Sequence, residues 1–591
     1  MVEENSNSII SDEIEVAEKL NNFFADTVKN LDIVKYIPDY EQSNADICDI
    51  IDRYSQHPSV LKINEYIETS DIFHFSNVTT EEMNIGIKKL KTNKATATDD
   101  IPAKILIKSH EIISVYLTKI YNESKINNKF PASLKLADIT PTYKKNERTK
   151  KENYRPVSIL PTVSKLFERI LYNEIFIYVE KHLSPYLFGF RKGHSTEQCL
   201  LVMLERWKRA LDKKFKVGAI LTDLSKAFDC LNHELLIAKL HAYGFGIPSL
   251  KYIYSYLHDR WHRTKQGCSF SSWKEIKTGV PQGSILGPLL FNIFMNDIFL
   301  FNNSFNIASY ADDNTPYAME KDIDTLIETL ENDTSMMMEW FEINEMKSNS
   351  DKCTLIVDKE AGIEARVGMD MIKGSTSVKL LGVTIDNELN FAEHVSTLCR
   401  KASQKFHALA RVSQFMNKEK IRVIMKSFIT SQFNYCPLIW MFHSRRLNNR
   451  INRIHERALR LVYKDYHYTF NEMLKKDGSY SIHHRNLQKL ATEMFKIKNN
   501  LSPTLMNDIF PQYDPVYNLR NNRCWINPYV RTVYYGTETI SYRGLKTWEL
   551  LPLSLRNINS LEKFKVEIKK WEPKGCICRL CKPYVPNLGF L

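Results

Sequence analysis

The sequence predicts an α+β fold, in which a region of mixed strands and helices is followed by a mostly helical one. Between residues 217 and 385, short runs rich in β-branched and aromatic residues alternate with longer stretches of helical periodicity. From residue 386 to about 465, helical periodicity prevails and basic residues are frequent. Hydrophobic residues make up 43% of the 591 residues and charged residues 25%, with 19 glycines and 21 prolines. This composition is typical of a folded chain and excludes collagen-like or low-complexity structure.

The segments before residue 217 are predicted in the same way. Residues 1–75 alternate short apolar and acidic patches, which favours a mostly helical lead-in. Thr79 and Thr80, followed by Glu81 and Glu82, resemble a helix cap, so a helix is expected to begin there. Four prolines separate short apolar runs between residues 130 and 162, which indicates strands and turns. Helical periodicity returns at 164–182 and 195–212.

Charge and cysteine content limit the classes of function. The chain has 81 Lys and Arg against 69 Asp and Glu, a net charge of +12, which suits a polyanionic partner such as nucleic acid or merely aids solubility. Eleven scattered cysteines and an acidic N-terminus without a signal pattern argue against secretion. The most apolar stretch, residues 285–301, carries too many polar groups for a membrane span and predicts a buried helix. We therefore expect an intracellular protein, nuclear and cytoplasmic, without a membrane partner.

Two apolar runs end in carboxylates. Residues 217–222 lead into Asp223, and a buried strand there would hold this side chain rigidly at the edge of a sheet. Residues 307–311 lead into Asp312 and Asp313, and residues 315–319 are suited to return antiparallel, which predicts a hairpin with both acids at its tip. An isolated pair of aspartates is more often an exposed turn. The functional interpretation therefore depends on the rest of the chain.

If the two strands are neighbours, the three carboxylates converge. Like charges at such distances require divalent cations, and ligands that are all oxygen favour Mg²⁺ or Mn²⁺. Two such ions about 3.5–4 Å apart support an in-line phosphoryl displacement. The pattern thus predicts a two-metal site formed by Asp223, Asp312 and Asp313.

A loop rich in glycine and proline, GVPQGSILGP at 279–288, lies between the two carboxylate runs. Glycines let the backbone approach a ligand closely, and Gln282 offers both a donor and an acceptor there. The loop is therefore a candidate ligand-contacting segment. The alternative is an ordinary turn at the start of the apolar helix.

Arginines repeat with helical spacing in residues 445–462. They fall at 446, 450, 453, 457 and 460, and apolar residues repeat with the same steps one residue later. One helix would carry an apolar stripe for docking beside an arginine stripe that faces outward. Aligned arginines repel one another, and a phosphate backbone relieves that repulsion, although a solvated face is the alternative. The predicted duplex-binding residues are Arg446, Arg450, Arg453 and Arg457.

Three thiols lie close together near the C-terminus, at Cys576, Cys578 and Cys581. Zinc requires four ligands, and no histidine follows in the remaining ten residues. A distant cysteine such as Cys524 is an alternative fourth ligand. On this basis a zinc site is not favoured.

The order and spacing of these motifs resemble a known family. Asp223 with Phe228, then GVPQGSILGPLLF, then YADD, are similar to the palm of reverse transcriptases, more narrowly those of non-LTR, LINE-type retrotransposons of the jockey-like group. FPASLKLADITPTYKK and NYRPVSILPTVSKLFERIL resemble the fingers motifs, and LFGFRKGHSTEQCLL the template-contacting segment. WFEINEMKSNSDKCTLIV resembles the segment after the catalytic hairpin, and VKLLGVTIDNELNFAEHV the primer grip. The resemblance covers residues 75–465 strongly and 466–591 more loosely, with one departure at KATATDDIP.

The resemblance implies a right-hand polymerase with fingers, a palm with an antiparallel sheet, and a helical thumb. The implied parts are a lead-in (1–75), fingers and N-terminal extension (76–215), palm and primer grip (216–385), basic thumb (386–465) and a mixed, cysteine-rich C-terminal region (466–591). The implied activity is RNA-directed DNA synthesis from dNTPs, on an RNA template and a DNA primer or target DNA, with two Mg²⁺ or Mn²⁺ ions.

The resemblance also implies roles for single residues. Asp223 and Asp312 would bridge the two metals, with Asp313 alongside and the Leu224 carbonyl as an extra ligand, and Lys352 would protonate the departing pyrophosphate. Lys144 and Arg155 would contact the triphosphate, while Gln282 would pack on the nascent pair. Phe228 would lie beneath the ribose and exclude a 2′-hydroxyl, unless it is a core aromatic. Arg191 and Lys192 would contact nucleic acid.

Two other functions compete with reverse transcription. One is an RNA-templated RNA polymerase, which Phe228 argues against because that class needs a small or polar group at the sugar. The other is a silent or domesticated relic that only binds nucleic acid. The three carboxylates and the PQG loop are all intact, which argues against a relic. The chain carries no retrovirus-like protease, knuckle or integrase motif. Because about 75 residues precede the fingers, the endonuclease usual in this family is expected from a missing upstream region.

Overall fold

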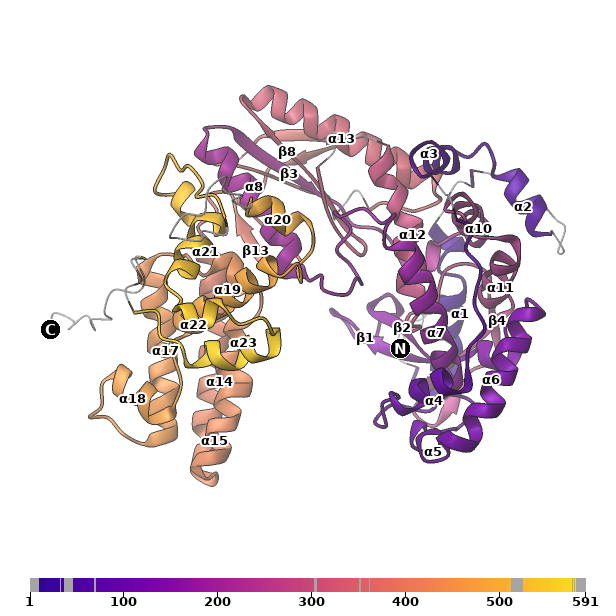
Figure 1. The fold of residues 1–591 in the computed structure, drawn as a ribbon, viewed down its shortest axis with the longest axis horizontal. Helices are drawn as coiled ribbons and strands as arrows, with labels where there is room; N and C mark the ends of the chain where they lie inside the picture. The colour runs from indigo at the N-terminus through magenta and orange to yellow at the C-terminus, as the bar shows by residue number, and fades with distance from the viewer. Residues whose placement is uncertain are drawn as a thin grey trace. The chain divides into compact units, whose positions relative to one another are not determined.

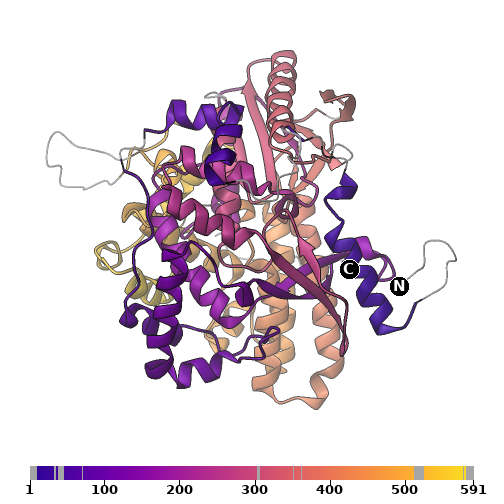
Figure 2. The same ribbon diagram turned by 90° about the vertical axis from the view of Figure 1, so that its right-hand side faces the viewer.

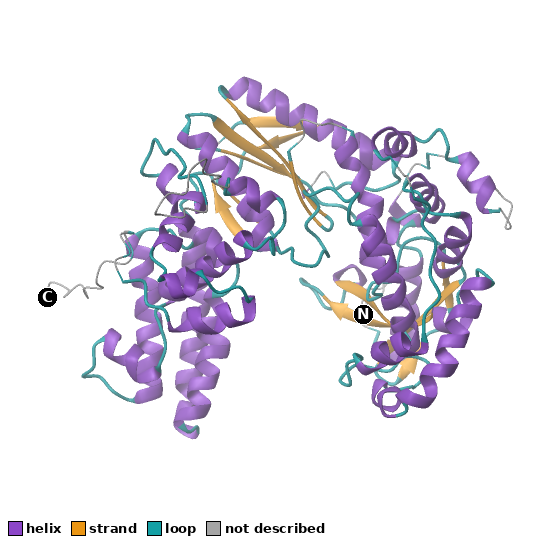
Figure 3. Ribbon diagram, in the orientation of Figure 1, coloured by secondary structure: helices purple, strands orange, loops and turns teal. Residues whose placement is uncertain are grey.

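The structure is a computed structural model that describes residues 10–31, 33, 35–36, 46–68, 71–301, 306–349, 352–360, 362–511, 525–574, 576, 578 and 580. Its helices and strands form two compact units that alternate along the chain (Figures 1 and 3). Unit 1 comprises residues 1–190, 223–305 and 335–349, and unit 2 comprises 191–222, 306–334 and 350–591. Both units contain helices and strands, so the α+β prediction is confirmed.

Unit 1 begins with helices, as predicted for the lead-in. They are α1 (Glu13–Ala25), α2 (Ile47–Arg53), α3 (Pro58–Tyr66), α4 (Thr80–Lys88), α5 (Ala103–Lys108) and α6 (His110–Ile126). The predicted helix cap is present, because Thr79 and Glu82 exchange backbone and side-chain hydrogen bonds at the start of α4. The helix buries Met83 and Ile87 completely. Helix α1 packs through Leu20 and other apolar side chains on the sheet of this unit.

The unit 1 sheet consists of β1 (Leu136–Tyr143), β2 (Tyr154–Ile159), β4 (Arg260–Gln266), β5 (Ser269–Phe270) and β6 (Lys274–Ile276). The order is β2-β1-β4-β5, and β6 also pairs with β4. Strands β1 and β2 form an antiparallel hairpin, whereas β1 and β4 are parallel. The strands and turns predicted for residues 130–162 are thus confirmed.

Helices complete unit 1: α7 (Thr162–Val179), α9 (Ala227–Cys230), α10 (His233–Ala242), α11 (Ile247–Leu257) and α12 (Gly287–Met295), which continues as a 3-10 helix at Asn296–Leu300. The apolar stretch is a buried helix, as predicted. Its end contains a buried ion pair, in which Lys239 Nζ lies 2.6 Å from Asp297 Oδ1 and Trp340 Nε1 donates to Asp297 Oδ2. Burial lowers the pKa of Lys239 to about 8, although Asp297 opposes that shift.

Unit 2 is built on a four-stranded antiparallel sheet of β7 (Ile307–Tyr310), β8 (Asp313–Glu320), β3 (Lys216–Leu221) and β9 (Thr354–Val357), in that order. Helix α8 (Thr196–Asp212) packs on it, and α13 (Ile323–Ile343) faces β3 through Leu326 and Leu330 (Figure 3). At Gly218 a Cβ would stand 2.9 Å from a methyl group of Leu330 on α13, so the missing side chain allows close packing. Two small hairpins follow, β10 (Glu364–Val367) with β11 (Asp370–Lys373) and β12 (Ser377–Leu380) with β13 (Val383–Asp386).

The rest of unit 2 is helical. The helices are α14 (Ala392–Val412), α15 (Lys418–Ile424), α16 (Pro437–Trp440), α17 (Arg445–Tyr463), α18 (Phe470–Asp477), α19 (Ile482–Lys498), α20 (Leu505–Ile509), α21 (Ile540–Glu549), α22 (Leu553–Arg556) and α23 (Leu561–Glu567). Helices α14 and α17 lie side by side (Figures 1 and 2). The C-terminal region was expected to be mixed, but its described residues contain helices and no named strand. Each of these helices buries apolar side chains, so the core of this region is built from helices.

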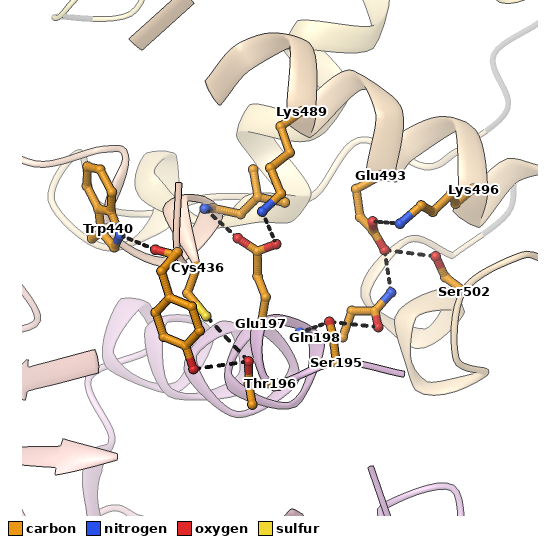
Figure 4. Close-up of polar contacts among 12 residues, drawn as sticks. Ser195, Thr196, Glu197, Gln198, Cys436, Trp440, Lys489, Glu493, Lys496 and Ser502 are labelled. Atoms are coloured by element: carbon orange, nitrogen blue, oxygen red, sulfur yellow. Dashed lines mark hydrogen bonds and ion pairs between the residues drawn. The ribbon is translucent and has the colours of Figure 1, made fainter. Parts of the chain in front are cut away.

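A polar network fixes the first turn of α8 within unit 2 (Figure 4). Glu197 accepts from Lys489 Nζ at 2.6 Å and from the Leu438 N–H at 3.0 Å. Gln198 Nε2 donates to Glu493 Oε1 at 2.7 Å, and Glu493 also accepts from Lys496 and Ser502. These charge-assisted bonds tie α8, which backs the sheet, to α16 and α19.

The part of the chain that the structure describes contains no helix with both the length and the apolar character needed to cross a membrane.

Candidate active site

The predicted carboxylate hairpin is present in unit 2. Strands β7 and β8 pair antiparallel with Tyr310 opposite Asp313, so Ala311 and Asp312 form the turn. Ala311 adopts a left-handed conformation, with φ of 58°. The sequence predicted both acids, Asp312 and Asp313, at the tip, so the observed turn lies one residue earlier. The difference arises because Asn314 is fully buried and paired with a neighbouring strand, which makes Asp313 the first residue of β8.

The strand that ends before Asp223 is the neighbour of β8, as expected. Strands β3 and β8 pair antiparallel, and an isolated bridge between Thr222 and Asn314 extends this pairing. The Asn314 carbonyl accepts from the Thr222 N–H at 3.2 Å and from Thr222 Oγ1 at 2.8 Å. Asp223 directly follows Thr222, and Asp313 directly precedes Asn314. The two carboxylates therefore belong to backbone positions adjacent to a directly hydrogen-bonded pair.

Unit 1 holds the backbone just after Thr222. The Asp223 carbonyl accepts from the Asn349 N–H at 2.9 Å, and the Ser225 N–H donates to the Lys347 carbonyl at 2.8 Å. Between these two bonds, Leu224 forms a bridge with Ser348 and buries its side chain. The backbone at Leu224, the proposed carbonyl ligand, is thereby fixed.

The side chain of Asp223 is partly exposed, as are those of Asp312 and Asp313 on the hairpin. Among the described residues, no group of three or more His, Cys, Asp or Glu side chains is already arranged around a metal position. The donor set is nevertheless all oxygen, which is the chemistry that Mg²⁺ and Mn²⁺ take. The metal assignment of Asp223, Leu224, Asp312 and Asp313 stays a prediction.

Lys352 lies two residues before β9, the strand on the other side of β3. It is exposed, and its carbonyl accepts from Thr354 Oγ1 at 3.3 Å. Thr354 pairs with Leu221, which is two residues before Asp223 in the chain. The lysine therefore lies at the end of the sheet where β3 leads into Asp223. Its role as proton donor stays a prediction.

In unit 1, Gln282 is held by a residue that the sequence did not single out. Gln282 Nε2 donates to both carboxylate oxygens of Asp229, at 3.0 and 3.1 Å, and its carbonyl accepts from the Ser158 N–H at 2.8 Å. Burial raises the pKa of Asp229, while the bond from Gln282 and the charge of Lys226 lower it. The only sequence signal was an acidic residue within the apolar segment AFDCL. The loop is therefore clamped between α9 and β2 rather than being a simple helix entry.

Two glycines make this clamp sterically feasible. At Gly279, with φ of 78°, a Cβ would stand 2.6 Å from the Asp229 carbonyl oxygen. At Gly283, with φ of 130°, a Cβ would stand 2.6 Å from the Ser158 carbonyl oxygen. Both contacts involve backbone atoms, so neither can be relieved by a side-chain movement. The glycines predicted to permit a close approach do so toward the protein's own backbone.

Phe228 belongs to an aromatic cluster in unit 1. Its ring stacks on Phe291 of α12 with centroids 4.4 Å apart, and meets Phe190 edge-on at 5.7 Å. Its carbonyl accepts from the Val280 N–H at 3.0 Å, which joins it to the glutamine loop. The side chain remains partly exposed. The cluster fixes the ring, and contact with a sugar stays a prediction.

The predicted triphosphate ligands come from one hairpin. Arg155 lies on β2 opposite Thr142, and Lys144 follows β1 with its N–H donating to the Asn153 carbonyl at 2.8 Å. Both side chains are exposed. Because β2 also carries Ser158, the hairpin is bonded directly to the loop of Gln282.

The arginine stripe lies on α17 with the predicted geometry. The apolar stripe is at least partly buried throughout, and Ile451, Ile454 and Ala458 are fully so. Arg460 is an exception among the arginines, because Glu456 and two carbonyls bind its guanidinium. The exposed members are Arg446, Arg450, Arg453 and Arg457. Two of them also contact α14, because Arg450 Nη1 donates to Ser396 Oγ at 3.3 Å and the Arg457 guanidinium lies 4.7 Å from the centre of the Phe406 ring. Binding of the four arginines to nucleic acid stays a prediction.

The other predicted nucleic-acid contacts, Arg191 and Lys192, lie four and three residues before the cap of α8 at Ser195. Lys192 is exposed and Arg191 partly so. Their contact with nucleic acid stays a prediction.

The C-terminal thiols meet a histidine from an earlier part of the chain, which the spacing of the cysteines did not indicate. Cys578 Sγ lies 3.2 Å from Nε2 of His483, 95 residues earlier in the chain. Both residues are buried, with 3% and 5% of their surface exposed. Cys581, and the alternative partner Cys524, lie outside the described residues.

Comparison with known proteins identifies the domain that contains these motifs. A family model described as "Reverse transcriptase (RNA-dependent DNA polymerase)" matches residues 143–385. This range includes β3, the carboxylate hairpin, the glutamine loop and the β1–β2 hairpin from Tyr143 onward. The chain therefore carries a reverse transcriptase domain.

Curated relatives narrow the class. The chain is 28% identical over 417 residues to "Probable RNA-directed DNA polymerase from transposon BS" of Drosophila melanogaster, covering 67% of this chain and 46% of the relative. It is 27% identical over 431 residues to "RNA-directed DNA polymerase from mobile element jockey" of the same species, covering 69% and 47%. A third relative, from transposon X-element, is 27% identical over 393 residues, covering 64% and 43%. The chain spans less than half the length of these relatives, and its resemblance to jockey-like non-LTR elements is confirmed.

Proposed function

We propose that this chain is an RNA-directed DNA polymerase, which extends a DNA primer on an RNA template. The observation that carries this proposal is the direct pairing of β3 with β8 inside the reverse transcriptase domain. It supports the assignment of Asp223, Asp312 and Asp313 to one catalytic site. The names of the relatives support the same activity.

The proposed chemistry is a two-metal displacement. Mg²⁺ or Mn²⁺ bound by Asp223, Asp312, Asp313 and the Leu224 carbonyl would supply charge neutralisation and activation of the primer hydroxyl. The exposed cations of Lys144 and Arg155 offset the charge of the incoming triphosphate. Lys352 donates the proton that the departing pyrophosphate needs.

The nucleotide itself is positioned by uncharged groups. The carboxamide of Gln282 contacts the nascent base pair, and Asp229 holds its Nε2 end so that the oxygen is presented in one orientation. The ring of Phe228, fixed by Phe190 and Phe291, excludes the 2′-hydroxyl of a ribonucleotide. Together they select a deoxynucleotide in the correct geometry for attack.

We assign the parts of a right-hand polymerase as follows: lead-in (1–75), fingers (76–215), palm and primer grip (216–385), thumb (386–465) and C-terminal region (466–591). The antiparallel sheet supports the palm, and the hairpin of β12 and β13 supports the primer grip. The exposed arginines of α17 support a thumb that binds the primer–template duplex, with Arg191 and Lys192 on the template. We assign generation of the DNA primer to an endonuclease outside the reverse transcriptase domain.

Primer extension on an RNA template, with dNTPs and Mg²⁺, tests this proposal. Asp312→Asn preserves the shape of the side chain but removes its charge, so extension should fall by several orders of magnitude while template binding is retained. Asp324→Asn, the same change at an exposed position on α13, serves as the matched control and should extend normally. Near-normal extension by Asp312→Asn would contradict the site assignment.

A further inference from the structure

The C-terminal thiols meet a histidine from another element of unit 2. His483 lies in the first turn of α19, whose cap is the Ser481 hydroxyl. Its Nε2 is 3.2 Å from Cys578 Sγ, and both side chains are buried. An imidazole nitrogen and a thiol sulfur are the two ligand types that zinc takes in structural sites.

Hydrogen bonds attach the segment just before the thiols to α19. Trp571, which lies a few residues before the thiols, accepts through its carbonyl from Gln488 Nε2 at 3.0 Å, and the same carbonyl lies 3.0 Å from His484 Nε2. The indole is 8% exposed. The chain is therefore fastened to α19 just before it reaches Cys576 and Cys578, which delivers the thiols to His483.

The separation suits two ligands of one ion. With Zn–N of about 2.0–2.1 Å, Zn–S of about 2.3 Å and a tetrahedral angle, the nitrogen and sulfur stand about 3.6 Å apart. The observed 3.2 Å differs from this by a few tenths of an ångström. A simple S–H···N hydrogen bond would also bring the atoms together, but it would not account for two further thiols within three residues on either side of Cys578 in a chain of scattered cysteines.

Cys576 is the nearest of those thiols that the structure describes. It is half-buried, and with Cys578 it lines a cavity of about 160 Å³ whose wall also contains Leu487 of α19. The cavity is also lined by two cations of α21, Arg543 and Lys546, but each is paired with a glutamate, Glu538 and Glu549 respectively. The described residues contain no completed group of three ligands, so Cys576 is not already beside the pair. The cavity gives its side chain room to turn toward an ion.

We propose that His483 and Cys578 bind a zinc ion, with Cys576 as a third ligand and a water molecule as the fourth, and that this ion fastens the C-terminal segment to α19. Binding replaces the thiol protons of both cysteines by the metal and needs no oxidant or reductant. The site lies apart in the sequence from the reverse transcriptase domain and does not depend on the polymerase assignment. Its effect is on the stability of unit 2, because an ion that binds only the folded state stabilises that state.

Metal analysis of the purified full chain tests this proposal. Protein expressed with added zinc and then gel-filtered should contain about one zinc per chain. His483→Ala and Cys578→Ser should each lower the content at least about tenfold, since loss of a ligand weakens binding strongly. The matched control is Cys436→Ser, a buried thiol that contacts Thr196 instead, and it should retain the metal. Wild-type protein without zinc, or variants with unchanged zinc, would overturn the proposal.

A second measurement covers the case in which the variants do not fold. Wild-type protein stripped of zinc and loaded with Co²⁺ should show a thiolate-to-cobalt charge-transfer band, and added Zn²⁺ should abolish it. Alkylation of the stripped protein should prevent the band, whereas alkylation after loading should be slower at the protected thiols. A cobalt complex without the charge-transfer band would refute thiolate ligation.

Discussion

Asp229 is expected to influence nucleotide incorporation only through Gln282. Its partly buried carboxylate accepts two hydrogen bonds from Gln282 Nε2, at 3.0 and 3.1 Å. Asp229→Ala removes both acceptors but keeps the backbone carbonyl that accepts from Thr278 Oγ1 at 3.1 Å. The amide of Gln282 would then be free to rotate, and its oxygen would no longer be held toward the nascent base pair.

The magnitude follows from these two bonds. Hydrogen bonds to a charged group contribute roughly 1.5–3 kcal/mol, and a freed glutamine regains rotamer entropy of up to about 2 kcal/mol. Because part of the loss falls on the folded loop rather than on catalysis, we expect about 1.5–3 kcal/mol in the incorporation step. That corresponds to a roughly 10- to 100-fold decrease in kcat/KM for a dNTP. Asp229→Asn retains one oxygen acceptor and should lose at most about tenfold.

The assay is single-nucleotide incorporation on an RNA template by wild type, Asp229→Ala, Gln282→Ala and the double variant. If Asp229 acts only by positioning Gln282, the double variant should equal Gln282→Ala alone. Thermal unfolding and template affinity of each variant control for a general loss of structure. Effects that add to within about 0.3–0.5 kcal/mol would show that the two residues act independently, and would refute the positioning argument.

Three further predictions concern other parts of the chain. Replacing the four exposed stripe arginines by Gln should weaken primer–template binding and lower the slope of its salt dependence by about one unit per lost phosphate contact. Arg460 is already bound to Glu456, so the control Arg460→Gln should change binding little. An unchanged slope in the four-arginine variant would show that the stripe does not contact phosphates. Phe228→Val should raise ribonucleotide use relative to deoxynucleotide use at least about tenfold, about 1.4 kcal/mol, in matched incorporation assays, and unchanged discrimination would assign Phe228 to the core. Burial raises the pKa of Asp333 to about 6, above its unfolded value of about 3.9, so its contribution to stability is present below pH 4 and lost as the pH rises through 6. Asp333→Asn should therefore be more stable than wild type by about 1–3 kcal/mol at pH 8 and equal to it near pH 4, as judged by urea unfolding, and a pH-independent difference would contradict this reasoning.

The sequence by itself determined the features that depend on nearby residues. The capping box at Thr79 and Glu82, the buried apolar stripe of α17 and the exposure of its arginines all follow from spacings of three or four residues. The β7–β8 hairpin was also predictable, because its strands are joined by a two-residue turn. These are interactions within one helix or between adjacent strands, so periodicity and turn residues specify them.

Only the tertiary structure decided which distant residues meet. The turn of the carboxylate hairpin lies earlier than predicted because Asn314 pairs with Thr222, more than ninety positions away in the sequence. Asp229 and Gln282, 53 residues apart, and His483 and Cys578, 95 residues apart, are likewise joined by packing. A single sequence carries no periodic signal for such pairs, since what brings them together is the burial of whole faces of helices and sheets. Motifs therefore revealed the class of chemistry, and the packing of the chain determined which side chains hold the motif residues in place.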